Sequence, residues 1–124
     1  MLAVSEIPAA DDVLEVGVNV VPLTDVARRL GLSESRVHQM LRDGHLLAVR
    51  RDGKLAVPAD LLTDEGVVKG VAGTITVLRD GGYADIEILR WLFTNDETLP
   101  GTPVSALRAD RGKEVKRRAQ AMAF

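Results

Sequence analysis

The apolar positions between residues 20 and 58 follow the spacing of two short helices and then of two β-prone runs. One apolar stripe indicates the first helix: Val26, Ala27 and Leu30. Thr24 is its predicted N-cap, because a hydroxyl can accept the free amide hydrogens of a first turn, and Gly31 is its predicted C′ residue. A helix that ends there leaves room for only a tight turn before the next one.

A second helix is predicted from its N-cap, Ser33, to about Asp43, with Gly44 as the stop. Three apolar side chains fall on one side of it and should pack on the first helix: Val37, Met40 and Leu41. The opposite side and its flanks are polar: Ser35, Arg36, His38, Gln39 and Arg42. Arginine suits guanine, glutamine suits adenine, and serine suits either bases or phosphates. Residues 34–43 are therefore the candidate recognition helix for a DNA major groove.

A β-hairpin is predicted directly after the helix pair. Asp52-Gly53 separates two β-prone runs, and these residue types tolerate the positive φ that both central positions of a type I′ turn require. Three basic side chains gather at its tip: Arg50, Arg51 and Lys54. Pro58 should end the second strand and start a short closing helix to Leu62. This order is typical of a winged helix-turn-helix, whose wing, here residues 50–54, contacts phosphates or the minor groove.

Beyond residue 63 the pattern is helical. Helices are predicted over 71–79, 84–93, 103–108 and from about Asp110 to the C-terminus, with Thr102 as an N-cap and Pro103 at N1. The predicted fold class is mainly α: a winged helix-turn-helix with one β-hairpin, followed by a C-terminal helical domain. Three segments are expected: an acidic flexible tail (1–17), the winged domain (18–63) and the C-terminal helical domain (64–124).

The net charge of −2 is distributed unevenly along the chain. Residues 1–27 carry −5, residues 28–54 carry +4, residues 55–108 carry −4 and residues 109–124 carry +3. The first positive segment is the proposed recognition helix and wing, which favours double-stranded DNA as the partner, with few phosphate contacts. The C-terminal basic set has two interpretations, a second electrostatic contact or the favourable placement of cations near a helix C-terminus. It comprises Arg111, Lys113, Lys116, Arg117 and Arg118.

Composition excludes several classes of protein and site. The chain has no cysteine, which excludes disulfides and thiolate metal sites. No apolar run reaches the ~18 residues of a membrane span and no export signal is evident, so we expect a cytoplasmic protein, at the nucleoid, without membrane contact. His38 and His45 have no further ligands at metal-binding spacing, and no catalytic or nucleotide-binding motif occurs. We therefore predict no enzyme activity, no cofactor, no metal and no small-molecule substrate.

Each candidate contact has a second interpretation, an ordinary solvated surface. Two residues flank the polar face of the second helix, Arg36 and His38. For each of them the two open interpretations are a phosphate contact and exposure to solvent. Arg28 is a candidate phosphate contact from the first helix, and the amide hydrogens that follow Ser33 are another, although Glu34 opposes an anion there. The favoured function is DNA binding, as a transcriptional regulator or a nucleoid-associated factor. The alternative is a winged-helix protein–protein interaction module without direct DNA binding.

The winged module resembles the MerR and excisionase-like DNA-binding domains. The similarity rests on LTDVARRLGLSESRVHQMLRDGHLLAVR, residues 23–50. MerR regulators dimerise through a long C-terminal coiled coil, but no heptad pattern here lasts three repeats. The MerR dimer mode and effector pocket are therefore not carried over.

The second half resembles an actinobacterial, chiefly mycobacterial, family of small DNA-binding proteins, on VLRDGGYADIEILRWLFTNDETLPG and EVKRRAQAMAF. This resemblance covers nearly the whole chain beyond residue 18 and implies a winged helix-turn-helix followed by a family-specific helical domain. It also implies a Ser/Thr protein kinase as a partner, which modifies a threonine of the N-terminal tail. Here Ser5 is the only hydroxyl side chain before Thr24, so Ser5 is the candidate phosphorylation site.

Overall fold

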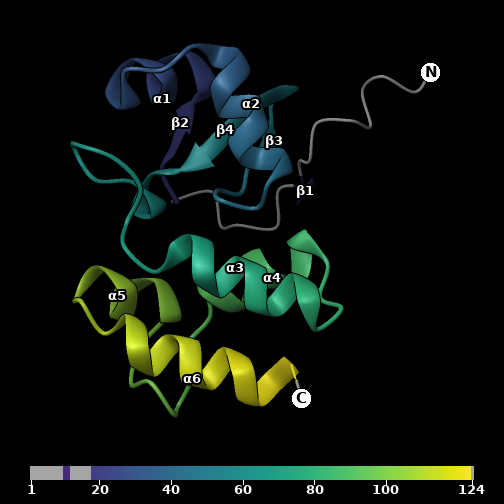
Figure 1. Cartoon of the computed structure of the whole chain (residues 1–124), viewed down its shortest axis with the longest axis vertical. Coiled ribbons are helices and arrows are strands. Elements are labelled where there is room, and N and C mark those ends of the chain that lie inside the picture. Colours follow the sequence, from purple (N-terminus) through teal and green to yellow (C-terminus); the bar gives the residue numbers. More distant parts are fainter. Residues whose placement is uncertain (1–9, 12–17, 124) are drawn as a thin grey trace.

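The winged half and the helical half lie one above the other along the long axis of the molecule (Figure 1). The computed structural model describes residues 10–11 and 18–123. The elements in chain order are β1 (Ala10–Asp11), β2 (Val20–Pro22), α1 (Leu23–Leu30), α2 (Glu34–Arg42), β3 (Val49–Arg51), β4 (Lys54–Pro58), the 3-10 helix η2 (Ala59–Leu61), α3 (Val71–Asp80), α4 (Asp85–Leu92), α5 (Pro103–Arg108) and α6 (Gly112–Ala123). The predicted fold class, a winged helix-turn-helix followed by a helical domain, is confirmed.

The sheet of the winged half has four strands in the order β1-β3-β4-β2. β3 and β4 form the predicted hairpin, β2 pairs antiparallel with β4, and β1 pairs in parallel with β3. The hydrophobic pattern did not predict β1 or β2, because runs of two and three residues are too short to show an alternation. β1 falls within the segment expected to be an acidic tail, residues 1–17; the other residues of that segment, including Ser5, lie outside the described part of the chain.

Two helices start at positions that differ from the prediction. Thr24 is not the N-cap of α1: the helix begins at Leu23, and its N-cap is Pro22, which makes no side-chain capping bond. The reason is that β2 continues directly into the helix, so the last residue paired with β4 is also the cap. α6 begins at Gly112 instead of about Asp110, because Asp110 has φ 62°, a left-handed conformation that α-helical residues do not adopt.

Apolar side chains from both halves form one continuous core. Val37 and Leu41 of α2 are fully buried against the core as predicted, whereas Met40 is half-buried. The backbone directly after α2 meets α3, since a Cβ added at Gly44 would lie 3.5 Å from Cγ2 of Ile75. The helical half therefore packs against the end of the candidate recognition helix.

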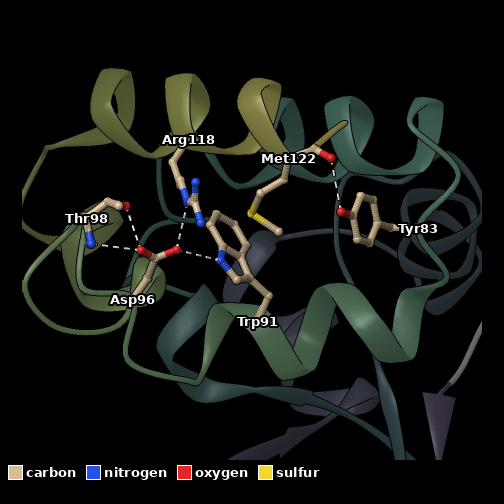
Figure 2. A network of polar contacts seen from close by, with 6 residues as sticks. All are labelled: Tyr83, Trp91, Asp96, Thr98, Arg118 and Met122. Atoms are coloured by element: carbon tan, nitrogen blue, oxygen red, sulfur yellow. Dashed lines mark hydrogen bonds and ion pairs between the residues drawn. The ribbon is translucent and has the colours of Figure 1, made fainter. Parts of the chain in front are cut away.

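A carboxylate with little solvent exposure ties the C-terminal helices together (Figure 2). The Asp96 side chain is 8% exposed and accepts hydrogen bonds from Nε1 of Trp91 at 3.1 Å, Nε of Arg118 at 3.0 Å, and the hydroxyl and amide of Thr98 at 2.6 and 2.9 Å. These bonds, that of the Thr98 hydroxyl foremost, hold the pKa of Asp96 well below its usual range. Tyr83 adds a further tie, because its hydroxyl donates to the carbonyl oxygen of Met122 in α6 at 3.1 Å.

Candidate nucleic-acid interface

The outer face of α2 is polar and accessible along its length. Four of its predicted groove contacts are exposed, and His38 is half-exposed; the four are Ser35, Arg36, Gln39 and Arg42. Ser33 caps the helix as predicted, its Oγ accepting a hydrogen bond from the amide of Arg36 at 3.2 Å. The cap, the buried inner side and the tight turn from α1 together place these side chains on one accessible face.

Gln39 lies in a short chain of hydrogen bonds on this face. Its Nε2 donates to Oδ1 of Asp43 at 2.9 Å, and its Oε1 accepts from Nη2 of Arg42 at 3.1 Å. All three side chains are exposed, so an incoming base edge can replace these partners at small cost. Asp43 was not among the predicted contacts, and it adds a carboxylate beside the candidate base-reading pair.

The hairpin tip has the predicted type I′ geometry, with φ 52° at Asp52 and 77° at Gly53. Arg50 and Lys54 are exposed. Arg51 is half-buried, and its Nη1 donates to the carbonyl oxygen of Val18 at 2.7 Å. The wing thus presents two exposed cations, while Arg51 fastens the segment that leads into β2.

Arg28 lies on the surface of α1. Its side chain is 80% exposed and forms an ion pair with Asp25, one turn earlier, at 3.0 Å. An exposed pair of this kind contributes little to stability, so a phosphate can compete for the guanidinium. Arg28 is therefore available for the contact predicted for it.

The helical half holds the carboxyl end of α2 through a residue that the sequence patterns did not single out. Arg79 of α3 forms a bidentate ion pair with Asp85, with distances of 2.9 Å from Nε and 2.8 Å from Nη2. The same guanidinium donates long hydrogen bonds to the carbonyl oxygens of Arg42 at 3.4 Å and Leu41 at 3.5 Å. A cation at the carboxyl end of a helix is electrostatically favourable. No local pattern could reveal this contact, since 37 residues separate Arg79 from Arg42.

In the described residues no group of three or more His, Cys, Asp or Glu side chains is placed to hold a metal ion. No helix in that part of the chain has the length and apolar character needed to cross a bilayer.

Comparison with known proteins relates both halves of the chain to one family. Residues 6–62 match the family model described as "DNA-binding protein Rv2175c, wHTH domain", and residues 68–123 match "Rv2175c C-terminal domain of unknown function". The chain belongs to the Rv2175c family of DNA-binding proteins. It is 48% identical over 134 residues to DNA-binding protein Rv2175c of Mycobacterium tuberculosis (strain ATCC 25618 / H37Rv), with 98% of this chain and 92% of the relative covered.

The fold of the Rv2175c family is shared as well. The NMR structure of Rv2175c matches this structure with a TM-score of 0.86 at 46% identity, covering 96% of this chain and 90% of that one. The family assignment confirms the resemblance to small mycobacterial DNA-binding proteins. The helical half, which contacts α2 through Arg79, is the part that the family description calls a domain of unknown function.

Proposed function

We propose that this member of the Rv2175c family binds double-stranded DNA, with α2 in the major groove and the β3–β4 hairpin on the phosphate backbone. The observation that carries the proposal is the exposed polar face of α2, capped by Ser33 and held by two buried apolar residues beneath it. The +4 charge of residues 28–54 and the two exposed wing cations support it.

The proposed contacts divide into base readers and phosphate binders. Gln39 and Arg42 read adenine and guanine edges, and Ser35 contacts either a base or a phosphate. Phosphate contacts are assigned to Arg28, the amide hydrogens that follow Ser33, Arg36, His38, Arg50 and Lys54. Arg51 adds positive charge to the wing while holding it to Val18.

Two biological roles fit this binding mode, a transcriptional regulator and a nucleoid-associated factor, and a cytoplasmic location at the nucleoid accompanies either. No enzymatic activity is part of the proposal. The family resemblance concerns a tail threonine that this chain lacks; if a Ser/Thr protein kinase modified Ser5 instead, the ~1.5–2 added negative charges on an acidic segment should weaken DNA binding. A Ser5→Glu protein that binds DNA as tightly as the wild type would contradict this expectation.

Fluorescence anisotropy with labelled random and promoter duplexes, at about 50 and 200 mM salt, tests the proposal. A steep salt dependence with preference for one fragment indicates a regulator, and the same dependence without preference indicates a nucleoid factor. Lys54→Ala should weaken all duplexes alike and lower the salt slope by about 1, whereas Gln39→Ala should cost about 1–3 kcal/mol and relax sequence preference. Arg90→Ala, an exposed cation on α4, is the matched control and should change neither.

Absence of binding to every duplex at low salt would refute the proposal. The fold would then be assigned to the alternative predicted from the sequence, a winged-helix protein–protein interaction module. An unchanged salt slope in Lys54→Ala, with affinity retained, would refute the wing assignment alone.

A further inference from the structure

A recess of about 800 Å³ opens in the helical half, where α3 and α6 begin. Of its ten lining residues five are basic and two are acidic; the basic ones are Lys69, Arg111, Lys113, Lys116 and Arg117. The starts of α3 and α6 lie close together, because a Cβ added at Gly70 would lie 3.7 Å from Cα of Gly112 and 2.9 Å from Cδ2 of Leu107. The basic side chains therefore line the recess where the two helices begin.

The cations of α6 do not lie at the carboxyl end, where they would stabilise the helix. Cations stabilise a helix near its carboxyl end and destabilise it near its amino end. α6 has no basic residue in its last turn, whereas Lys113 is its second residue and Lys116 and Arg117 follow one turn later. The interpretation that this basic set stabilises a helix C-terminus is therefore wrong.

Most of this charge is not neutralised within the recess. Arg111 pairs with Glu114 at 2.8 Å. Across residues 10–11 and 18–123, no ion pair holds Lys113, Lys116 or Arg117. Arg117 is partly compensated, because the pKa of the Glu114 carboxyl is lowered by its hydrogen bond from Arg111 and also by the attraction of Arg117. Lys113, in the first turn, opposes the helix dipole, and such a local conflict is typical of a functional surface.

We propose that this recess binds the phosphate backbone of a second DNA segment while α2 and the wing hold the first, an inference that rests on the proposed function. Positions 113, 116 and 117 share one side of α6, so their cations form a cluster, with Lys69 adding charge from the start of α3. A cluster of cations spread over two elements matches the repeated charges of a nucleic-acid backbone better than a single small anion.

The position of the recess explains why the second segment is distinct from the first. α6 lies at the opposite end of the long axis from α1 and α2 (Figure 1). A duplex seated on α2 meets the winged half, whereas the recess faces a separate duplex. The chain then joins two DNA segments, and the family domain of unknown function supplies the second contact.

A capture experiment with the full chain tests the inference. A short duplex is tethered to beads, protein is added, and the recovery of a second, labelled duplex from solution is measured. Replacing all three α6 cations, as Lys113→Gln/Lys116→Gln/Arg117→Gln, should lower recovery at least about fivefold. Loss of three phosphate contacts should also lower the salt slope of capture by about 2.7. Affinity for one short duplex in anisotropy should change less than about twofold, because α2 and the wing are intact.

Single substitutions provide matched controls. Lys116→Gln should reduce recovery, and Arg90→Gln, which removes one exposed cation outside the recess, should not. Capture equal to the wild type by the folded triple variant would overturn the inference. The inference would also be overturned if wild-type protein bound the tethered duplex but recovered no second duplex. The same holds if poly-glutamate abolished recovery as effectively as unlabelled DNA. If the wild type binds no duplex at all, the proposed function itself fails together with the inference.

Discussion

Removing the guanidinium of Arg79 should weaken DNA binding, although in the proposed complex Arg79 does not contact DNA. The guanidinium donates hydrogen bonds to the Asp85 carboxylate at 2.8–2.9 Å and to the last two carbonyl oxygens of α2 at 3.4 and 3.5 Å. Arg79→Ala therefore frees the carboxyl end of α2, the end that carries Arg42, and leaves Asp85 without its partner.

The magnitude follows from the exposure and length of these bonds. The two side chains of the ion pair are 27% and 24% exposed, so solvent screens part of the ~1.5–3 kcal/mol typical of a hydrogen bond to a charged group. We expect Arg79→Ala to lower the free energy of unfolding by about 1–2 kcal/mol. A cation at a helix carboxyl end contributes about 0.3–1 kcal/mol. If this ~0.3–1 kcal/mol stabilises the orientation of α2 that binds DNA, loss of the Arg79 cation lowers DNA affinity about 2–5-fold.

The assay measures anisotropy with a short duplex and urea unfolding on the same preparations. Arg108→Ala is the matched control, because Nη1 of Arg108 also joins the two halves, donating to the carbonyl oxygens of Asp60 at 3.1 Å and Leu62 at 2.9 Å, away from α2. The control should lose stability and keep its affinity, and Arg79→Lys should fall between the wild type and Arg79→Ala. Equal loss of affinity in both alanine variants, or none in either, would refute positioning of α2 by Arg79.

Three further predictions concern single side chains. Asp43→Asn removes a negative charge, that of the carboxylate which accepts from Gln39, and should raise DNA affinity about 2–5-fold at low salt. It should not lower stability, because an anion at a helix carboxyl end is unfavourable; unchanged affinity would place Asp43 away from DNA. Ser33→Ala removes a capping bond of 3.2 Å and should lower the free energy of unfolding by about 0.5–2 kcal/mol in urea, whereas Ser35→Ala, one position beyond the cap, should lower it less. Because the pKa of Asp96 is lowered in the folded state, its ionised carboxylate stabilises the fold fully above about pH 4, and this contribution is lost as the pH falls further. The free energy of unfolding of Asp96→Asn should be about 1.5–3 kcal/mol lower than that of the wild type at neutral pH, and the difference should shrink in acid. A difference that does not depend on pH would contradict the assignment.

Local signals in the sequence predicted most of the winged module. Ser33 and Gly31 mark helix ends by a capping hydroxyl and a left-handed conformation, and Asp52-Gly53 marks the hairpin by positive φ at both residues. Each of these features is determined by residues within one turn of the chain, so the local sequence is enough to predict it. Thr24 failed as a cap because its surroundings are set by the pairing of β2 with β4, about 35 residues away in the chain.

The features that could not be predicted are contacts between distant segments. Arg79 looks like an ordinary cation in the last turn of a helix, and only the packing of α3 against the end of α2 shows what it holds. Arg51 has the same sequence context as Arg50, yet one is half-buried against Val18 and the other is exposed. The alternation of side chains along a strand predicts two faces, but which face is covered depends on a segment elsewhere in the chain.

The acidic net charge is compatible with the proposed DNA contacts because charge acts locally in salt. At physiological ionic strength the screening length is about 8 Å, so a phosphate at the wing is influenced mainly by the residues nearest to it. These include the exposed Arg50 and Lys54 and also Asp11, which is in register with Arg50 across β1 and β3.

Of the acidic residues between 55 and 108, Asp80 is in α3 and Asp85 and Glu87 are in α4, the two helices that lie between the winged half and α6 (Figure 1). Asp96 lies against α6, where it pairs with Arg118. Acidic residues also lie in the winged half, Asp11 in β1 and Asp25 in α1, so the positive charge of that half is confined to α2, the wing and the last turn of α1. A sequence pI of about 5.7 is therefore compatible with proposed DNA contacts that are confined to α1, α2, the wing and the recess.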